Sequence, residues 1–573
     1  MALIFRFLKP YWKRCLLTVL VVVLDVAGTL FVPTIMADLI NDGLAGVQLN
    51  EIVKSGLLML AFSVLSGLGG LLGSWLCASL SAKIGRDMRN AIYDKSLLFS
   101  DGDFEKFGTG SMIMRTLNDV NVVQQAIVMC IQMILPVPVM VVLGIIFSFR
   151  INTNIGYLML GGMAVLILVA LVVILNASRI FAAMQKTLDK MNVVLRENIT
   201  GTRVIRAFNK QDYEEERANQ TFGKYATLAI KANNVFAGLD SIASLIINTS
   251  VVVIIWIGGN AVGAGEMLIG DISAVSQYAL MILYYIMMAQ MVVILLPRAN
   301  VCARRMSDVL SLSPEITDGK GAVSEDNTDE IIRFENACFR FSDAEKDTLK
   351  DISFSCRRGE TVAVIGGTGS GKSTIAKLLL RFGDVSSGRI TLKNTDIRSI
   401  PQSELRSRVA YVPQKAWLFS GTIADNLRHG KQDATEEEMK RALEVAQAKF
   451  VTQLPDGLQS HVAQGGTNFS GGQKQRLSIA RAIIKKADLY VFDDSFSALD
   501  FKTDAALRRA LACETKNSAV LIVAQRVNTI AHADKIIVLD NGGIVGTGTH
   551  NELMENCAIY REIALSQMKG ATT

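Results

Sequence analysis

Residues that suit phosphate chemistry gather in one glycine-rich loop in the second half of the chain. The loop follows the strand-like run Thr361–Ile365 and precedes a helical pattern that starts at Thr374. Its eight residues are Gly366, Gly367, Thr368, Gly369, Ser370, Gly371, Lys372 and Ser373. In this setting glycines let backbone N–H groups wrap phosphates, and the helix N-terminus adds a favourable dipole. We therefore expect this loop and Thr374 to bind ATP, with Lys372 on the outer phosphates and Ser373 on Mg²⁺.

A second apolar run supplies an acidic partner for that loop. The strand-like residues Leu489–Phe492 end in Asp493. A carboxylate at the carboxyl end of a strand beside a phosphate loop is suited to a second Mg²⁺ contact. Apolar strands that end in Asp are common, so this assignment depends on the motifs around it.

The elements that must position these residues belong to two regions of different composition. Half of the 573 residues are apolar, but the apolar runs of membrane length all lie before about Pro297. A helix needs about 20 largely apolar residues to cross the hydrocarbon layer. Six runs meet that length: Cys15–Ala37, Leu57–Leu80, Ala126–Phe149, Ile155–Leu175, Ile242–Val262 and Ile272–Leu296.

The distribution of basic residues predicts how these spans are oriented. Short loops rich in Lys and Arg stay in the cytoplasm, and the loop near Asn260–Asp271 has none. The segment between spans two and three carries Lys83, Arg86, Arg89, Lys95, Lys106 and Arg115. The segment between spans four and five is also basic. We therefore expect a multi-pass protein of the cytoplasmic (inner or plasma) membrane with both termini and the soluble domain in the cytoplasm, and the two long basic segments as helical extensions of the spans.

Charge and cysteine content exclude other classes. A formal net charge of +6 is small for a chain of this length and argues against a nucleic-acid partner. The eight cysteines show no C-x-x-C pair and no metal-ligand spacing, which favours free thiols.

Two features inside the spans bear on what the membrane region binds. Asp25 lies near the middle of the first span, where a carboxylate is costly unless it faces water or a partner group. The sixth span carries Tyr278, Tyr284, Tyr285, Met287, Met288 and Met291, a surface that suits varied apolar ligands. Contact with cargo and ordinary helix packing both remain open for these groups.

Further motifs in the soluble region identify a family. Phe469–Gln473, followed by Lys474, Gln475 and Arg476, resembles the signature loop of ABC transporters. Gln414 lies in a segment like the Q-loop, Ser497–Asp500 resembles the D-loop, and Phe341 occupies the place of an adenine-stacking aromatic. The order and spacing match from Ile331 to about Tyr560, and six preceding spans resemble an exporter half-transporter. Phe104–Met112 and Thr200–Asn209 fall where the family has coupling helices.

The resemblance implies a fold, a division into domains and a shared nucleotide site. The expected fold is an α-helical transmembrane bundle of six spans with long cytoplasmic helical extensions, followed by an α/β P-loop ATPase domain of the ABC type. We expect a transmembrane domain over residues 1–305, a linker over 306–330 and the nucleotide-binding domain over 331–573. In the family two such domains meet head to tail. Ser470, Gly471, Gly472 and Gln473 would then contact nucleotide held by a partner chain, and Gln414 would join Ser373 and Asp493 around Mg²⁺.

The sequence departs from the family pattern at two catalytic positions. Asp494 stands where active members have Glu, which withdraws the carboxylate by about one carbon–carbon bond of 1.5 Å. Gln525 stands at the position of the switch histidine and cannot carry its positive charge. The signature loop is nearly intact, since only Phe469 replaces the usual Leu. Slow hydrolysis at this chain's own site beside such a signature loop is typical of heterodimeric exporters, in which a different chain supplies Glu and His. A homodimer with two slow sites is the alternative.

The expected activity is ATP-driven export of amphiphilic small molecules of the multidrug type across the cytoplasmic membrane, with the lipid bilayer as a further partner. Lipids and unprocessed peptides are alternative cargoes. A lipid headgroup suits a basic inner cavity, and the spans contain no strong basic cluster, which favours the multidrug type. An ATP-gated channel or sensor subunit is a further alternative, since slow hydrolysis suits it as well.

Overall fold

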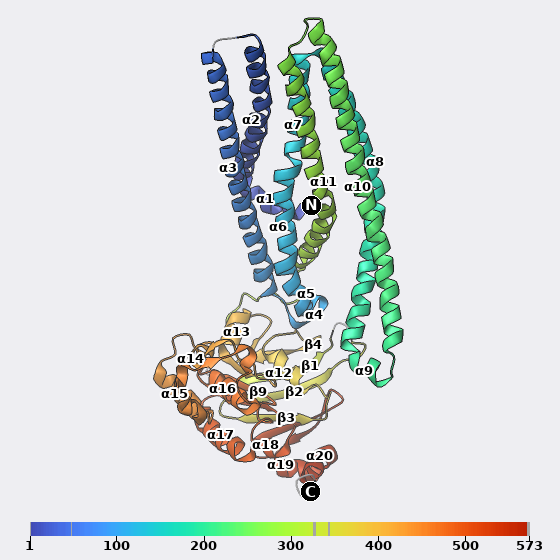
Figure 1. The fold of residues 1–573 in the computed structure, drawn as a ribbon. Coiled ribbons are helices and arrows are strands. Elements are labelled where there is room, and N and C mark those ends of the chain that lie inside the picture. The colour runs from blue at the N-terminus through green and yellow to red at the C-terminus, as the bar shows by residue number, and fades with distance from the viewer. Residues whose placement is uncertain (1, 47–48, 325–327, 342–343, 570–573) are drawn as a thin grey trace. The chain divides into compact units, whose positions relative to one another are not determined.

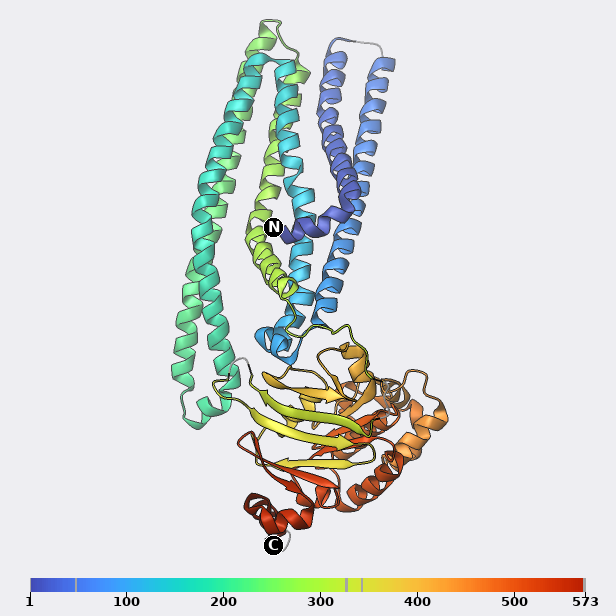
Figure 2. The ribbon, with the colours of Figure 1, turned by 180° about the vertical axis from the view of Figure 1, so that it is seen from behind.

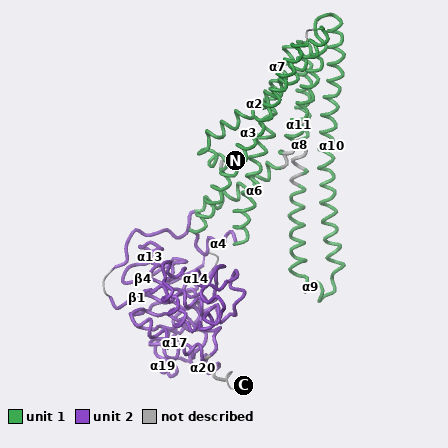
Figure 3. Tube along the Cα trace, turned by 60° about the vertical axis from the view of Figure 1, so that its left-hand side comes forward, with its two compact units in different colours: residues 1–97, 109–312 green, residues 98–108, 313–573 purple. Residues whose placement is uncertain are grey.

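The computed structural model describes the backbone of residues 2–46, 49–324, 328–341 and 344–569. It divides into two compact units, shown in different colours in Figure 3. Unit 1 contains residues 1–97 and 109–312, and unit 2 contains residues 98–108 and 313–573.

Unit 1 is entirely helical within the described residues. Its elements are α1 (Ala2–Leu8), η1 (Lys9–Tyr11), α2 (Trp12–Leu44), α3 (Leu49–Ser96), α5 (Thr109–Met114), η2 (Arg115–Asp119), α6 (Val120–Met129), η3 (Cys130–Ile134), α7 (Pro136–Ile151), α8 (Thr153–Thr200), α9 (Thr202–Ala207), α10 (Gln211–Gly263) and α11 (Ile269–Ser311). Two of them, η2 and η3, are π-helical turns inside the third span. The buried core of the unit includes Leu30, Met140 and Tyr278 from three different spans.

Within the described part of unit 1, six helices are long and apolar enough to cross a membrane, which confirms the predicted count. The helical extensions are confirmed too. Helix α8 has 48 residues and at 1.5 Å per residue is about 70 Å long, more than twice the roughly 30 Å of hydrocarbon. It runs beside α10, with the short helix α9 joining the two at their tip (Figures 1 and 2). Mutual packing of α8 and α10 therefore supports the part of each helix that lies beyond the hydrocarbon layer.

Unit 2 is an α/β domain built on three sheets. Its strands are β1 (Glu330–Phe339), β2 (Leu349–Arg357), β3 (Thr361–Gly366), β4 (Ser387–Leu392), β5 (Thr395–Asp396), β6 (Val409–Val412), β7 (Gly421–Thr422), β8 (His461–Val462), β9 (Leu489–Asp493), β10 (Ala519–Val523), β11 (Lys535–Asp540) and β12 (Gly543–Gly548). Its helices are α4 (Asp101–Phe107), α12 (Lys372–Leu379), α13 (Gln402–Arg408), α14 (Ile423–Arg428), α15 (Glu436–Val445), η4 (Lys449–Gln453), η5 (Gly457–Gln459), η6 (Gln464–Gly466), α16 (Gly471–Ile483), α17 (Phe501–Glu514), α18 (Val527–Ile530), α19 (His550–Asn556) and α20 (Ala558–Lys569).

The central sheet of unit 2 has the strand order β12-β11-β3-β10-β9-β6. The pairs from β11 to β6 are parallel, and β12 is antiparallel to β11. An antiparallel sheet of order β2-β1-β4-β5 accompanies it. Along β3, Ala363 and Ile365 belong to one buried core, and Val362 and Val364 belong to a second core on the opposite face. A strand that is covered on both faces has a continuous run of apolar residues, which is why β3 and β9 could be predicted from the sequence.

The segment expected to be a linker is held against the domain. Gly321 donates its N–H to the carbonyl of Ser399 at 2.8 Å, and Val323 donates its N–H to Oε1 of Glu404 at 3.0 Å. A Cβ added at Gly319 would lie 2.1 Å from the carbonyl of Ser399. Residues 319–323 are therefore held against the nucleotide domain by these backbone contacts.

Helix α4 belongs to unit 2 although it precedes most of unit 1 in sequence. Ser100 caps the helix in a reciprocal pair with Asp103. The buried Asp103 carboxylate also accepts the N–H of Glu315 at 3.1 Å, and Lys377 forms an ion pair with Asp101 at 3.1 Å. The expected coupling segment Phe104–Met112 therefore overlaps the end of α4 and the start of α5, and the one at Thr200–Asn209 contains α9.

Candidate nucleotide-binding site

Strand order alone brings most of the predicted nucleotide residues to one sheet edge. The parallel strands β3, β10, β9 and β6 are consecutive neighbours. Their carboxyl ends lead into Gly367, Ala524, Asp494 and Pro413 respectively. Ligands of open parallel sheets bind outside the carboxyl ends of the strands. The phosphate loop, Gln525, the Asp493–Asp494 pair and Gln414 therefore share this edge, although up to 160 residues separate them in the chain.

The phosphate loop needs glycine at the positions where the sequence has it. Gly369 and Gly371 have φ angles of +82° and +94°, a region that residues with a Cβ rarely adopt. A Cβ at Gly366 would lie 2.2 Å from the carbonyl of Leu539, and one at Gly371 would lie 2.5 Å from the Leu349 side chain. Gly367 and Thr368 are exposed at the outer rim of the loop. The loop shape is thus fixed by close backbone approach.

Lys372 is held on the loop that it follows. Its ammonium group donates to the carbonyls of Gly366 at 2.9 Å and Gly367 at 2.6 Å. Burial lowers the pKa of Lys372, and the nearby carboxylates of Asp494 and Asp493 oppose that shift. A buried ammonium that contacts carbonyl oxygens would bind phosphate oxygens more strongly, because phosphate oxygens carry more negative charge. Helix α12 begins at Lys372 rather than at Thr374, so Lys372 and Ser373 both belong to its first turn.

Ser373 and Asp493 are already paired. The Ser373 hydroxyl donates to Oδ1 of Asp493 at 2.8 Å, and the Tyr411 hydroxyl lies 3.4 Å from Oδ2. Burial raises the pKa of Asp493, and the hydrogen bonds from Ser373 and Tyr411 offset part of that rise. A hydroxyl and a carboxylate at this distance present two hard oxygen ligands to one point, the chemistry that Mg²⁺ prefers.

Asp494 is fixed by contacts on both sides. Its N–H donates to the carbonyl of Val523 on β10 at 2.8 Å, and its Oδ2 accepts from Nε2 of Gln414 at 3.2 Å. Burial raises the pKa of Asp494, while the Gln414 amide and the charges of Lys372 and Arg526 act in the opposite direction. The structure thus joins Gln414 with Asp494 across two strand ends.

Gln525 lies in the turn between β10 and α18, where its side chain is exposed. The turn is anchored on one side because Ala524 donates its N–H to the carbonyl of Val364 on β3 at 3.0 Å. On the other side Gln567 of α20 spans the turn. Its Nε2 donates to the carbonyl of Gln525 at 2.7 Å, and its Oε1 accepts the N–H of Val527 at 2.9 Å.

Tyr411 and Gln567 were not among the residues expected at the site. Tyr411 lies three residues before Gln414 on a strand next to β9, so the Q-loop motif pointed to its neighbourhood but not to its contact with Asp493. Gln567 is 42 residues from Gln525 in the chain, and nothing in the local sequence connects the two.

The residues present fit a magnesium nucleotide. The hydroxyl oxygen of Ser370 is buried and has no hydrogen-bond partner among the described residues, a costly state unless a ligand supplies one. Around it lie the first turn of α12, the ammonium of Lys372 and the Ser373–Asp493 pair. Phosphates would be held by the loop N–H groups and Lys372, and Mg²⁺ by Ser373, Asp493 and the nearby Gln414. The bound ion would supply charge neutralisation of the phosphates.

The signature residues form a separate helix start. Ser470 caps α16: its hydroxyl accepts the N–H of Gln473 at 3.4 Å, and Oε1 of Gln473 accepts the N–H of Ser470 at 2.9 Å. Gly471 has open space around it, and a Cβ at Gly472 would lie 3.2 Å from the carbonyl of Ala498. Among the described residues, the side-chain hydrogen bonds of Ser470 and Gln473 stay within this cap. The phosphate loop and the signature residues are therefore two independent halves.

Phe341 keeps an exposed aromatic face. Its ring packs edge-on against Phe339 with centroids 4.9 Å apart, and 39% of the residue remains exposed. This leaves room for a planar base to stack.

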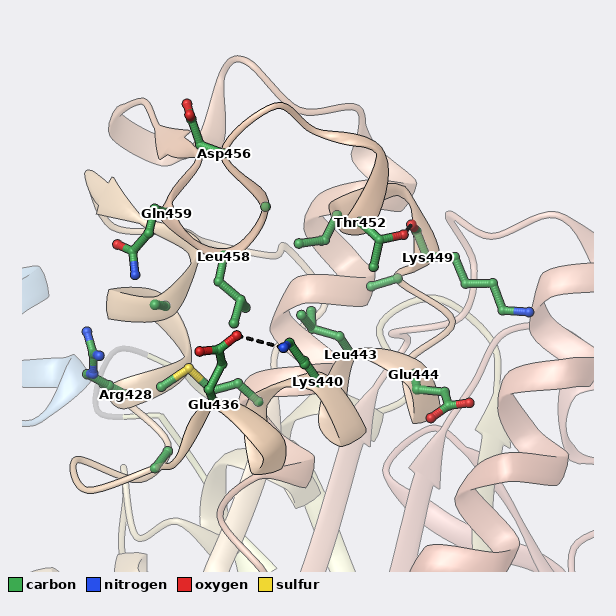
Figure 4. Close-up of a pocket in the computed structure, with 16 residues that line it drawn as sticks. Arg428, Glu436, Lys440, Leu443, Glu444, Lys449, Thr452, Asp456, Leu458 and Gln459 are labelled. Atoms are coloured by element: carbon green, nitrogen blue, oxygen red, sulfur yellow. Dashed lines mark hydrogen bonds and ion pairs between the residues drawn. The ribbon is translucent and has the colours of Figure 1, made fainter.

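A hollow of unit 2 lies away from these residues. Figure 4 shows side chains that line it, which come from α14, α15 and the turns η4 and η5. Its volume is about 670 Å³. Leu443 and Leu458 line it, and Lys440 and Glu436 form an ion pair at its rim at 2.6 Å. It contains none of the predicted nucleotide residues.

Comparison with known families agrees with this fold. Residues 15–287 match the ABC transporter transmembrane region, and residues 349–497 match the ABC transporter ATPase model. The chain is 37% identical to an uncharacterized ABC transporter ATP-binding protein of Mycobacterium tuberculosis over 100% of this chain and 99% of that protein. It is 30% identical to a probable multidrug resistance ABC transporter of Bacillus subtilis, covering 97% of this chain and 95% of that protein.

Two further matches extend the comparison. The chain is 32% identical to an ATP-dependent lipid A-core flippase of Desulfotalea psychrophila, covering 82% of each chain. The structure of a bacterial Atm1-family ABC exporter with ATP bound superposes with a TM-score of 0.80 at 23% identity, covering 97% of this chain and 98% of that one. The predicted fold class is therefore confirmed.

The fold and site define a membrane-embedded P-loop ATPase, with six spanning helices ahead of its nucleotide domain. The chain belongs to the ABC transporter family as an exporter half-transporter, a multi-pass membrane protein whose ABC ATPase domain couples ATP hydrolysis to transport. ABC exporters work as dimers in a membrane.

Proposed function

We propose that this chain is one subunit of a heterodimeric exporter whose own phosphate-loop site binds ATP well and cleaves it slowly. The observation that carries the proposal is the pair Asp494 and Gln525 at the sheet edge, beside complete binding groups. General-base catalysis needs a carboxylate within hydrogen-bond reach of the attacking water. A displacement near 1 Å costs about a hundredfold in rate.

The geometry of Asp494 supports a weak base. Its backbone is tied to β10 and its carboxylate to Gln414, so it cannot move forward freely to make up for the missing methylene. Gln525 supplies at most a neutral amide hydrogen bond toward a γ-phosphate, where an imidazolium would supply charge as well. Two groups that support hydrolysis are thus weakened at one site.

The signature half of the chain supports a fast site elsewhere in the dimer. Ser470, Gly471, Gly472 and Gln473 keep the family pattern, and their helix start is fully capped. We assign these residues to nucleotide held by a different partner chain, which supplies Glu and the switch His. Only one of the two composite sites then turns over rapidly.

For cargo we propose amphiphilic small molecules of the multidrug type, exported across the cytoplasmic (inner or plasma) membrane with both termini and the ATPase domain in the cytoplasm. The Tyr- and Met-rich face of α11 supports this cargo class, and a relative in Bacillus subtilis carries the name of a multidrug transporter. The lipid A-core flippase among the relatives makes a lipid the second candidate.

The deciding experiment compares ATP hydrolysis by the purified chain alone with hydrolysis by the chain co-purified with a neighbouring half-transporter. We expect little turnover from the chain alone and at least tenfold more from the pair. Full turnover by a dimer of this chain alone would favour the homodimer and overturn the proposal. Concentration of a dye into inside-out vesicles against its gradient separates a pump from an ATP-gated channel or sensor subunit, because a channel cannot concentrate its substrate.

A further inference from the structure

A cavity inside the membrane unit brings together the features that the sequence left open. It has a volume of about 310 Å³, at the lower end of the range for small-molecule sites. Four spans contribute: α2, α3, the third span at η3 and α11. Its polar groups are Asp25, Ser74, Gln132, Tyr284 and Tyr285.

Asp25 presents its carboxylate to this cavity without a basic partner. Its Oδ1 accepts from the Ser66 hydroxyl at 2.8 Å. Gly69, Gly70 and Gly73 of α3 also line the cavity and lie close to α2, since a Cβ at Gly70 would lie 3.4 Å from Oδ2 of Asp25. The cavity lining contains no Lys or Arg, and no described residue forms an ion pair with Asp25. An intramembrane carboxylate of this kind needs a compensating charge or proton.

The remaining walls suit an aromatic organic cation. Tyr284 and Tyr285 both line the cavity, and their rings meet edge-on with centroids 5.8 Å apart. Aromatic rings attract cations that approach their faces. Met133 and Met288 add soft, adaptable apolar surface. The π-helical turn η3 carries Gln132 and Met133 into the lining, and such turns are frequent at functional sites. The side chain of Met291, also expected on this face, lies outside the described residues.

We infer that this cavity is a binding site for the cationic group of a monovalent aromatic amphiphile, with Asp25 as its counter-ion. The inference rests on the proposed export of amphiphilic molecules and names the charge class of the cargo. Small residues on α3 leave space beside the carboxylate, aromatic groups on α11 cover the cation, and apolar side chains take the hydrocarbon part.

The test measures equilibrium binding of tetraphenylphosphonium to the full chain and its dimer partner in lipid nanodiscs, with neutral triphenylphosphine oxide as the uncharged probe. We expect Asp25→Asn to weaken tetraphenylphosphonium binding about tenfold or more, because the charge-assisted contact is lost, and to leave the neutral probe within twofold. Asp25→Glu, which keeps the charge, should retain discrimination between the probes. Asp38→Asn removes a carboxylate from the same helix about 20 Å away and should behave as the parent.

Three results would overturn the inference. Unchanged cation binding in Asp25→Asn would place the site elsewhere, equal weakening of both probes would mean a packing role, and loss of the dimer would mean that Asp25 pairs with the partner chain. Vesicle uptake by the unmodified dimer tests the proposed function separately. If it concentrates only neutral amphiphiles, the cation inference fails and export stands; if it concentrates nothing, export fails whatever Asp25→Asn does to binding.

A different observation concerns Gln567. The side-chain amide of this residue hydrogen bonds to the backbone on both sides of Arg526, at the carbonyl of Gln525 and the N–H of Val527. Helix α20 is itself fixed by the buried Tyr560 and Ala564. The geometry points to Gln567 as a positioning residue that holds the Gln525 turn where its side chain faces the γ-phosphate. This second inference depends on the assignment of Gln525 to that phosphate.

Selectivity between ATP and ADP tests this role, since ADP has no γ-phosphate. The dissociation constants of Mg-ATP and Mg-ADP are measured for the dimer whose partner has lost its own phosphate-loop lysine. We expect Gln567→Ala to weaken ATP about five- to tenfold and ADP less than twofold. Gln567→Glu keeps the acceptor for Val527 and should lie between. Glu562→Ala, on the same helix, should match the parent.

Equal weakening of ATP and ADP in Gln567→Ala would reduce the residue to a structural support, and no change in either would remove it from the site. Gln525→Ala separates the two assumptions. If that variant fails to lose ATP selectively, the assignment of Gln525 is wrong; if it does and Gln567→Ala does not, only the positioning role is wrong.

Discussion

The phosphate loop and the signature loop of this chain differ in what has been kept. The phosphate loop retains its glycines, Lys372 and the Ser373–Asp493 pair, while the residues beside it that would support cleavage are Asp494 and Gln525. The signature loop retains its cap, its glycines and Gln473. In the proposed assignment, the phosphate-loop half therefore keeps its binding groups but has weaker groups for cleavage. The signature half keeps its capped helix start and its glycines.

That difference supports the proposal that the two loops bind different nucleotides. If both served the same one, substitutions at Asp494 and Gln525 would make the intact signature loop useless. In a head-to-tail dimer the signature loop serves the partner's nucleotide, so its integrity and the loss of two cleavage groups are compatible. Variants in the two loops should therefore have unequal effects on turnover of the complete dimer.

The largest effect is expected from Gly472→Ala. The added Cβ would lie 3.2 Å from the carbonyl of Ala498 and shift the start of α16, where the partner's nucleotide is to be contacted. A misplacement near 1 Å costs about a hundredfold, so we expect ATPase turnover of the dimer to fall by one to two orders of magnitude. Steady-state phosphate release measures the turnover. As the control, the unfolding temperature of the variant should equal that of the parent.

A smaller loss of turnover is expected from Lys372→Met. Removing a charged donor should weaken ATP binding at this chain's own site by roughly 10- to 100-fold, and turnover at the other site should fall less than in Gly472→Ala. Nucleotide binding and phosphate release are measured on the same preparation. If the Lys372 variant hydrolyses more slowly than the Gly472 variant, the assignment of the slow site is reversed.

A gain is expected from restoring the cleavage groups. Asp494→Glu alone should raise turnover by no more than a few fold, because Gln525 still lacks a positive charge. The double variant Asp494→Glu, Gln525→His should add a second working site and so roughly double the turnover, or more, since general-base catalysis supplies large factors. Single-turnover hydrolysis with the partner's site blocked isolates the effect. Equal rates in all three proteins would show that neither residue limits cleavage.

The smallest effect is expected from Asp103→Asn, which changes neither loop and should alter the stability of unit 2 rather than ATP turnover. Burial alone would raise the pKa of Asp103, but the N–H groups of Glu315 and Ser100 and the charge of Lys106 outweigh it and lower the pKa. A lowered pKa stabilises the fold above the ordinary value of 3.8, and this contribution disappears as the pH falls through the lower folded pKa.

We therefore expect Asp103→Asn to destabilise unit 2 by about 1 kcal/mol at pH 7 and the difference from the parent to shrink below about pH 4. Thermal unfolding in detergent at both pH values measures it. A difference that grows toward low pH would contradict the sign of the shift.

Much of the fold could be predicted because long apolar runs leave few alternatives. Six spans and strands β3 and β9 follow from continuous hydrophobic segments, and the helical extensions follow from the length of the two basic segments between spans. Helix boundaries were harder: α12 starts two residues before the predicted Thr374, because Lys372 and Ser373 are polar and give no periodic signal. Helix α4 starts at Asp101, where a reciprocal cap between Ser100 and Asp103 fixes it ahead of the expected segment.

Side-chain partners across strands could not be predicted. The Gln414–Asp494 bond joins residues 80 positions apart, and the Tyr411–Asp493 contact joins residues 82 apart. Each depends on β6, β9 and β10 being neighbours in the sheet, an order that pairing and packing decide together. The position of residues 319–323 depends on a backbone hydrogen bond from Gly321 to Ser399, which composition cannot reveal.

The sequence by itself determined the chemistry of this protein: a phosphate loop with its lysine, a signature loop, an acidic strand end and two altered cleavage positions. These motifs depend on residue types at short spacing, which can be recognised in the sequence without a structure. Only the tertiary structure decided which of these residues meet, that Gln567 spans the Gln525 turn, and that Asp25 lies in a cavity with Tyr284 and Tyr285. The reason is physical, because contacts between distant segments are set by strand order, helix packing and the space left by small residues.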